Sequence, residues 1–204
     1  MTTRNFLAVT AFGTVIALSG TLAGCSKSDA ESKAAAHKPA ATTSATKAAP
    51  APLSGYVHDA DNDVFGYYMP DKDYRVGKFV FRNISLGGAE DFDSYEGGHN
   101  TDKAFAPVML EFDDTTSKQN TNELGGIYYA NAPRVLPLAY KVSASGFAFA
   151  GNDKQLGAVT FTGKLDMAAL KAAQDGKDTV VAIGDLTFGG KTFKNVKLTW
   201  FGGD

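Results

Sequence analysis

The sequence predicts an all-β, mainly antiparallel domain, folded as a β-sandwich or a small β-barrel with one short connecting helix. Residues 55–204 hold 19 Gly and 21 aromatic residues among 150 positions, and this combination favours strands joined by tight turns. Two turns that contain glycine separate segments rich in β-branched and aromatic residues. A single segment has the composition and the flanking residues of a helix.

The C-terminal hairpin is the clearest element. Gly189 and Gly190 separate residues 179–188 from residues 191–201, and a two-residue Gly-Gly loop suits a turn with positive φ. The pairs expected on counting outward are Thr187–Thr192, Asp185–Lys194, Ile183–Val196, Val181–Leu198 and Thr179–Trp200. We expect this face to carry an ion pair with an apolar ladder behind it, and the opposite face, with Leu186 and Phe193, to be mostly solvent-facing.

The remaining elements follow from turn residues and prolines. A second hairpin is expected at residues 151–154, between strands at 140–150 and 156–165, with a β-bulge at Gly146. Earlier strands are expected at 74–86, 105–112 and 124–129, where Pro107, Pro133 and Pro137 favour edge or strand-start positions. The helix is expected at 167–174, because Asp166 can cap its first turn and Gly follows at its end.

Composition excludes several classes of protein. The chain has a net charge of −2, and residues 55–204 have 15 Lys and Arg against 20 Asp and Glu, which excludes the basic footprint of a nucleic-acid-binding protein. The single cysteine excludes a disulfide framework and a cysteine-only zinc site within the chain. The sequence has no Gly-rich phosphate-binding motif, and we expect no cofactor.

Residues 1–24 have the features of a secretory signal peptide. Arg4 gives a positive start, and the apolar stretch at residues 6–18 is shorter than the roughly 20 residues that a bilayer-spanning helix needs. The stretch ends in Leu22-Ala23-Gly24-Cys25, which resembles the lipobox of bacterial lipoproteins at all four positions. The resemblance implies cleavage before Cys25 and acylation of its sulfur and its new amino group. The alternative is a plain signal peptide cut elsewhere, with Cys25 an incidental thiol.

The resemblance also implies a location. Ser26 rather than Asp follows the cysteine, and in the lipoprotein pattern this implies the outer membrane, where we expect the periplasmic face rather than the cell surface. Residues 25–54 are rich in Ala, Lys, Ser, Thr and Pro, so we expect a disordered tether that cannot bury enough apolar surface to fold. Residues 55–204 then form a single globular domain.

Two strings of adjacent aromatic residues are candidate binding surfaces. Tyr67 and Tyr68 lie in the first, and Tyr128 and Tyr129 lie in the second. Neighbouring residues of a strand face opposite ways, so if one face is the core, the other presents an aromatic ring to solvent. Exposed Tyr is common where proteins bind proteins or sugars. The alternative is a sheet covered on both faces, or loops packed over a barrel end.

Candidate metal ligands are acidic. Asp59, Asp61 and Asp63 alternate as calcium ligands do, but the loop lacks the Gly and the Glu that an EF-hand has at its sixth and twelfth positions. These carboxylates are a candidate for a looser calcium site, and the alternative is a solvated acidic turn. His99 follows the acidic residues 90–96 and is a candidate metal ligand or general base, with His58 as the other histidine of the domain.

The sequence contains no coherent catalytic set. The Gly-x-Ser-x-Gly elbow is missing, and no free cysteine remains if Cys25 is acylated. We therefore expect a protein that is not an enzyme but an envelope-anchored binding or inhibitor lipoprotein, such as an immunity-type inhibitor of an incoming toxin or an assembly partner of an envelope machine. Its expected partners are the bilayer, through Cys25, and an envelope or incoming protein. The acidic domain would suit a basic partner.

The alternative function is that of a carrier or receptor. A small barrel can enclose one lipid, haem or other hydrophobic ligand, and this would place Phe147, Phe149, Phe161 or Trp200 around a void. A hydrolase is a third hypothesis.

Overall fold

The computed structural model of the protein describes residues 52–59, 61–100, 102–123 and 125–203. Its large sheet contains β1 (Tyr56–His58), β2 (Gly66–Pro70), β3 (Arg75–Val76), β4 (Phe79–Leu86), β5 (Val108–Asp114), β8 (Arg134–Val135), β9 (Pro137–Ser143), β10 (Gly146–Asp153), β11 (Gly157–Leu165), β12 (Val180–Phe188) and β13 (Lys191–Phe201). A small separate sheet contains β6 (Gln119–Thr121) and β7 (Ile127–Tyr129), and the two helices are α1 (Ala89–Glu96) and α2 (Met167–Gln174).

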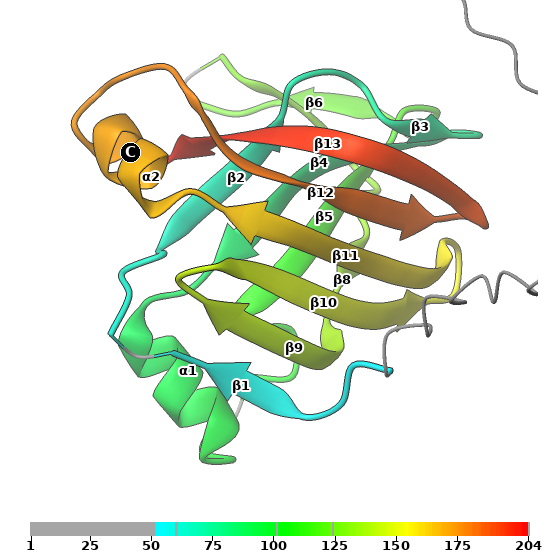
Figure 1. Ribbon diagram of the computed structural model, residues 1–204. Helices are drawn as coiled ribbons and strands as arrows, with labels where there is room; N and C mark the ends of the chain where they lie inside the picture. The colour runs from blue at the N-terminus through cyan, green and yellow to red at the C-terminus, as the bar shows by residue number, and fades with distance from the viewer. Residues whose placement is uncertain (1–51, 60, 101, 124, 204) are drawn as a thin grey trace, which may run out of the picture. The chain divides into compact units, whose positions relative to one another are not determined.

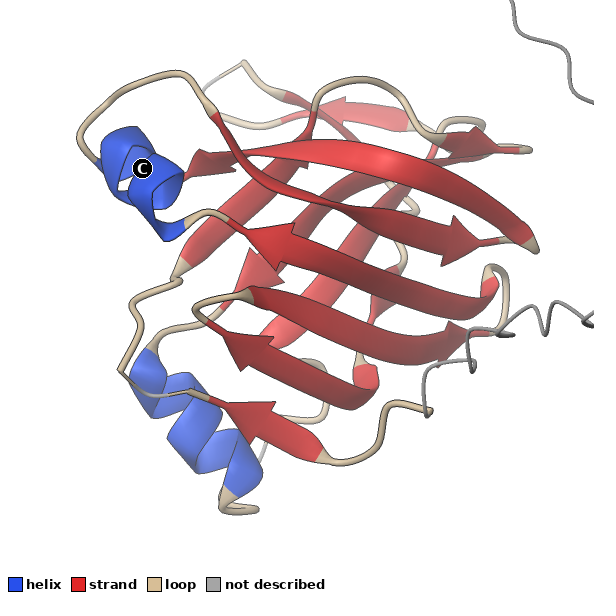
Figure 2. Ribbon diagram, viewed as in Figure 1, coloured by secondary structure: helices blue, strands red, loops and turns tan. Residues whose placement is uncertain are grey.

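The eleven strands of the large sheet curl into a half-barrel (Figure 1). Ten of them lie in the order β1-β9-β10-β11-β12-β13-β2-β4-β5-β8, and β3 pairs with β4 beside this path. The pairing of β1 with β9 is parallel, and every other pairing described is antiparallel. Figure 2 shows the two helices at the periphery of this strand-built domain. The expectation of a mainly antiparallel β fold is confirmed.

The hydrophobic core lies between the two halves of the curled sheet. Tyr68 of β2 contacts Phe147 of β10 with ring centroids 5.5 Å apart, and Phe112 of β5 contacts Phe188 of β12 at 4.9 Å. All four side chains are fully buried or nearly so. Because each pair joins a strand of one half to a strand of the other, the sheet closes around aromatic rings.

The hairpin of β12 and β13 forms at the expected turn. Gly189 and Gly190 have φ angles of 56° and 73°, as a two-residue turn of this kind requires. The expected pairing is confirmed next to the turn, where Lys194 Nζ lies 2.7 Å from Asp185 Oδ2. The other confirmed pairs are Thr187–Thr192 and Leu186–Phe193.

Beyond that ion pair the expected register is wrong by one residue from Gly184 to Ala182, and a second irregularity restores it at Val180, which lies opposite Thr199. Asn195 has a φ of 55° and forms a bulge. Gly184 therefore lies opposite Val196, and Ile183 lies opposite Lys197. The available signal was a change of phase, because two consecutive polar residues, Lys194 and Asn195, separate Phe193 from Val196.

The expected faces of the same hairpin are wrong for Leu186 and Ile183, whereas Val181, Val196 and Leu198 of the expected apolar ladder are buried. Leu186 is fully buried, whereas Ile183 is 44% exposed. The physical reason is the ion pair of Asp185 and Lys194, which shares a face with Ile183. Burial of two charges costs several kcal/mol per ion in typical proteins, so this face stays in water and the face of Leu186 turns to the core.

Residues 140–150, expected to form one strand with a bulge, form parts of two strands. Ser143 ends β9 and lies opposite Gly146, which begins β10 across a tight turn. Gly146 has a φ of 149°, and a Cβ there would collide with the carbonyl oxygen of Gly163. The hairpin of β10 and β11 is confirmed, but its turn runs from Asp153 to Gly157 rather than over residues 151–154.

The earlier strands and the prolines agree with expectation more closely. Residues 74–86 form β3 and β4 with a turn at Gly77, and the stretches 105–112 and 124–129 overlap β5 and β7. Pro107 precedes β5, Pro133 precedes β8, and Pro137 begins β9. The expected edge or strand-start positions of these prolines are therefore confirmed.

The expected helix is confirmed as α2, and α1 was not expected. Asp166 Oδ1 accepts the backbone N–H groups of Ala168 and Ala169 at 3.0 Å each, as an N-cap does. Helix α1 has a weaker pattern, because Phe92 is its one buried residue. Its first turn is held by Asp91, whose Oδ2 accepts the N–H of Gly88 at 2.9 Å.

Helix α1 packs against side chains on the core-facing side of β1 and β9. The ring of Phe92 stacks on His58 with centroids 3.8 Å apart, and Tyr95 packs edge-on against Tyr56 at 5.1 Å. Tyr140 of β9 donates a hydrogen bond to Glu96 Oε1 at 2.9 Å. These contacts attach α1 to the end of the large sheet that β1 and β9 form.

Candidate functional site

The strongest candidate site is an exposed aromatic surface where β2 begins and β13 ends. Phe65, Tyr67 and Phe201 are 47%, 39% and 47% exposed, and Trp200 beside them is half-buried. We call Phe65, Tyr67 and Phe201 the β2–β13 patch. Clustered exposed aromatic side chains on a soluble domain mark sites of interaction more often than scattered ones do.

Strand pairing holds the rings of the patch together. Tyr67 lies opposite Phe201 in the register of β2 and β13, and their ring centroids are 6.3 Å apart. Tyr67 also lies opposite Ser85 of β4. Paired residues of a sheet point to the same face, so Tyr67 and Phe201 both lie on the outer face, opposite the core residue Tyr68.

A glycine makes room for Trp200, which lies opposite Tyr68 on the core face behind the patch. The indole Nε1 of Trp200 donates a hydrogen bond to the carbonyl oxygen of Phe65 at 2.8 Å. Gly66 has a φ of 134°, and a Cβ there would overlap the indole. The indole ring therefore lies against bare backbone, which fixes the position of the chain that carries Phe65.

Tyr68 does not belong to any surface. The residue is fully buried, and its hydroxyl donates to the carbonyl oxygen of Val64 at 2.8 Å. Burial, followed by the charge of Asp63, raises the pKa of Tyr68. The expectation that adjacent aromatic residues of this string face opposite ways is confirmed, and of the two named tyrosines Tyr67 alone remains a candidate for binding.

The second aromatic string forms part of the small sheet. Tyr128 is 42% exposed and Ile127 is 67% exposed. Tyr129 is half-buried, and its hydroxyl accepts a hydrogen bond from Gln119 Nε2 at 3.1 Å. This hairpin exposes apolar side chains on a two-stranded sheet with three residue pairs, so its side chains are held less rigidly than those of the large sheet.

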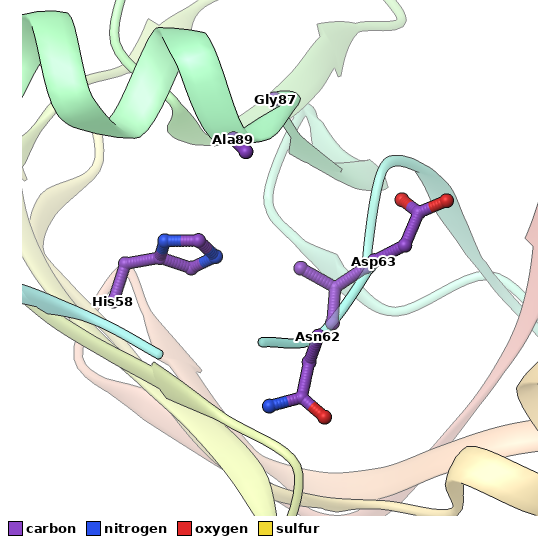
Figure 3. A pocket seen from close by; sticks show the side chains of 6 residues that line it. His58, Asn62, Asp63, Gly87 and Ala89 are labelled. Atoms are coloured by element: carbon purple, nitrogen blue, oxygen red, sulfur yellow. The ribbon is translucent and has the colours of Figure 1, made fainter. Parts of the chain in front are cut away.

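A cavity of about 240 Å³ lies at the N-terminal end of α1. Its lining residues are His58, Asn62, Asp63, Val64, Gly87 and Ala89. Figure 3 shows the carboxylate of Asp63 pointing away from the imidazole of His58. Asp63 Oδ1 instead accepts the backbone N–H of Phe65 at 3.2 Å, and His58 stacks on Phe92. The two side chains are thus used in local structure, and they do not form an acid–base pair.

The calcium candidate has a similar local role. Asp59 Oδ1 accepts the N–H of Asp61 at 3.3 Å, in the same way as Asp63 accepts that of Phe65. No group of three His, Cys, Asp or Glu side chains within the described ranges could hold a metal ion. His99 is exposed after the end of α1. The structure therefore does not bring the expected acidic and histidine residues together.

The two acidic residues at the end of β5, Asp113 and Asp114, interact with residues of neighbouring strands and loops. Asp114 is buried and accepts hydrogen bonds from Lys78 Nζ at 2.7 Å and from Thr116 and Asn131. The Lys78 ammonium group, with these other donors, holds the pKa of Asp114 well below its usual range. Asp113 has a raised pKa, mainly because of burial. These groups tie β5 to the loops on either side of it.

The residues expected to surround a ligand void are packed against each other. Phe147, Phe149 and Phe161 are each at most 2% exposed, and the rings of Phe147 and Phe161 stack at 4.9 Å. None of these three, nor Trp200, lines the cavity beside α1. Aromatic side chains fill this part of the half-barrel.

One member of the patch was not anticipated from the sequence. The last pair expected on counting outward from the Gly189–Gly190 turn was Thr179–Trp200. Phe201 is the next residue, at the end of the expected strand. Phe65 was within the first aromatic string, and its spacing of two from Tyr67 indicates a shared face in a strand. The sequence thus contained a signal for each phenylalanine: the count from the turn for Phe201, and the spacing from Tyr67 for Phe65.

The lipobox, Cys25 and most of the expected tether lie outside the described residues. Neither helix of the described part of the chain is long and apolar enough to cross a membrane. Comparison of the chain with protein-family models, with curated proteins and with solved structures finds no match in any of the three.

Proposed function

We propose that the protein is an envelope-anchored, non-enzymatic module that binds a protein partner through the β2–β13 patch. The observation that carries the proposal is the joint exposure of Tyr67 and Phe201, which are paired in the sheet, and of Phe65, which directly precedes β2. The resemblance of residues 22–25 to a lipobox supports the location in the outer membrane.

The patch has the properties that a protein-binding surface needs. Phe, Tyr and Trp are enriched in protein interfaces, where they bury large areas with few rotatable bonds. Tyr67 and Phe201 are held in strand register, and the Trp200 indole is hydrogen-bonded to backbone. A surface that is already ordered loses less conformational entropy on association.

The filled interior of the half-barrel favours protein binding over the carrier alternative. A carrier needs an internal space, and the rings of Phe147 and Phe161 occupy the region in which that space was expected. Either an inhibitor of an incoming protein or an assembly partner of an envelope machine would use a patch of this kind. Both are binding functions in which the protein catalyses no reaction.

The test is site-specific photo-crosslinking in cells that produce the full chain. A crosslinking amino acid replaces Tyr67 in one strain and Thr160, which is exposed on β11, in a control strain. We expect one stoichiometric partner at position 67 and not at position 160. Absence of any crosslink at 67, or the same products at both positions, would contradict the proposal.

A matched pair of variants then separates the patch from other exposed apolar groups. Phe65→Ser combined with Phe201→Ser should abolish capture of the crosslinked partner. Ile127→Ser combined with Tyr128→Ser removes comparable apolar surface from the small sheet and should leave capture unchanged. If the second pair abolishes capture and the first does not, the partner binds the β6–β7 hairpin instead.

A further inference from the structure

The charges of the domain are segregated along the chain. Residues 55–133 carry six Lys and Arg against 14 Asp and Glu, whereas residues 134–203 carry nine against five. The second group builds β9 to β13 and α2, so one half of the curled sheet is basic although the domain as a whole is acidic. Strands β11, β12 and β13 together contain four Lys and one acidic residue, Asp185.

A row of three residues crosses the outer face of these strands. Lys164 of β11 lies opposite Ile183 of β12, which lies opposite Lys197 of β13. Both lysines are exposed, and Ile183 is 44% exposed between them. We call these three residues the Lys-Ile-Lys row. Adjacent strands are about 4.8 Å apart, so the backbone positions of the two lysines lie about 10 Å from each other.

The lysines of the row are free of acidic partners. Among the described residues, neither Lys164 nor Lys197 has a carboxylate within 4.0 Å, whereas Lys194 is paired with Asp185. Lys141 of β9 is exposed in the same half and is likewise unpaired. Around the row the outer face carries small side chains, including Thr160, Thr162 and Thr187.

From this arrangement we propose that the outer face of β11, β12 and β13 docks on an anionic lipid surface through the Lys-Ile-Lys row. Charge complementarity carries the proposal, because unpaired lysines facing outward attract anionic headgroups. Each Lys close to an anionic membrane strengthens binding about fivefold. An exposed aliphatic side chain between two lysines can enter the headgroup region while the flexible lysine stems keep their charges in water.

The composition of the face favours a membrane over an acidic protein. Lys is depleted in protein interfaces, which use aromatic and Arg side chains as anchors, and the Lys-Ile-Lys row has neither. Headgroups are mobile and do not require the fixed geometry that a planar guanidinium provides. The biological setting rests on the proposed envelope location, but the lipid interaction is measurable without the protein partner.

Docking in this way would orient the binding patch. Lys197 and Phe201 are four residues apart on β13, which corresponds to about 13 Å along the strand. A domain held through the Lys-Ile-Lys row therefore carries the β2–β13 patch at the rim of the membrane contact. A partner embedded in the same membrane, or bound to it, could reach the patch there.

The experiment uses the full lipidated chain in vesicles with a dye that reports polarity. Cys25 is the single cysteine of the chain, so Ile183→Cys adds a unique label site once Cys25 is acylated. An Asp93→Cys variant labels exposed α1 as a control. In vesicles of phosphatidylcholine and phosphatidylglycerol at 3:1, the dye at 183 should shift to shorter wavelength relative to pure phosphatidylcholine. The dye at 93 should not shift, and 0.5 M salt should reverse the shift at 183.

Charge-matched variants complete the test. Lys164→Glu with Lys197→Glu should reduce the shift about tenfold or more. Lys171→Glu with Lys177→Glu makes the same change of net charge on exposed residues of α2 and the loop after it, and should retain the shift. Identical spectra in the two vesicle types, or equal loss in both variants, would overturn the proposal. A shift of the dye at 183 that appears in pure phosphatidylcholine vesicles only after envelope proteins are added would overturn it in favour of a protein interface.

Discussion

The indole of Trp200 and the backbone of Phe65 are joined by a 2.8 Å hydrogen bond across 135 positions of the chain. The bond connects the end of the last strand with the residue before β2. Phe65 belongs to the proposed binding patch, and Trp200 lies behind it on the core face. The contact depends on Gly66, whose missing side chain leaves the space that the indole occupies. This relationship between two distant residues is open to direct test.

Gly66→Ala should destabilise the protein and displace Trp200. The added methyl group meets the indole, and Gly66 has a φ of 134°, so we expect the free energy of unfolding to fall by about 2–4 kcal/mol. Gly77→Ala is the control, because Gly77 has a φ of 57° with open space around it. That variant should lose about 1–2 kcal/mol. Urea unfolding measures both, and equal losses would show that the indole contact is unimportant.

The bulge at Asn195 should tolerate glycine but not valine. Asn195 has a φ of 55°, and its N–H donates to Asp185 Oδ1 at 3.2 Å. A β-branched residue at this φ is strained, so Asn195→Val should lower the free energy of unfolding by about 1–2 kcal/mol. Asn195→Gly removes the strain and should change it by less than about 0.5 kcal/mol. Chemical denaturation measures the free energy of unfolding of both variants. A valine variant as stable as wild type would argue against the bulge.

Asp114→Asn should remove a part of the acid sensitivity of the fold. Because Lys78 and the other donors lower the pKa of Asp114, its ionised form stabilises the folded state above the pKa of an unfolded chain, about 3.9. This stabilisation is lost as the pH falls below about 4. The stability difference between wild type and variant should therefore shrink between pH 5 and pH 2, which flank that value. Asp93→Asn on the exposed face of α1 is the control, and a constant difference for Asp114→Asn would disprove the expectation.

Tyr74→Phe should have the opposite pH dependence. Burial, together with the hydrogen bond that its hydroxyl donates to Asp71 at 2.7 Å, raises the pKa of Tyr74 to about 12. The stabilisation is complete below the unfolded pKa of about 10 and is lost as the pH rises towards the folded value. The difference in the free energy of unfolding between wild type and Tyr74→Phe should therefore shrink above about pH 10. A pH titration followed by absorbance at 295 nm should show one fewer tyrosine that ionises at high pH in the variant than in wild type. Tyr128→Phe, which removes an exposed tyrosine, is the control.

Much of the fold could be predicted because its signals are local. The Gly189–Gly190 turn, the Asp166 cap and the strand-start prolines each act within a few residues, and all of them are found where expected. The orientation of the β12–β13 hairpin could not be predicted in the same way. Both of its faces contain apolar side chains, and the bulge at Asn195 exchanges them partway along the strand.

The candidate site was predictable in part for a related reason. Alternation in a strand told us that Tyr67 and Tyr68 face opposite ways, but only the tertiary structure determines which of them meets the core. Helix α1 escaped prediction because its segment buries Phe92 alone, and its packing depends on His58 and Tyr140, which lie far away in sequence. The grouping of Phe65 with Phe201 likewise depends on a strand pairing across most of the domain.

The parallel edge strand β1 gives the domain a mechanical weak point. Tyr56, Val57 and His58 form its three pairs with β9, and any load transmitted through the preceding residues reaches this strand first. Detaching β1 would uncover one side of α1 while the antiparallel strands stay paired. Under the proposed anchoring of the N-terminus and docking of the domain, tension would therefore detach this single strand before the rest of the sheet.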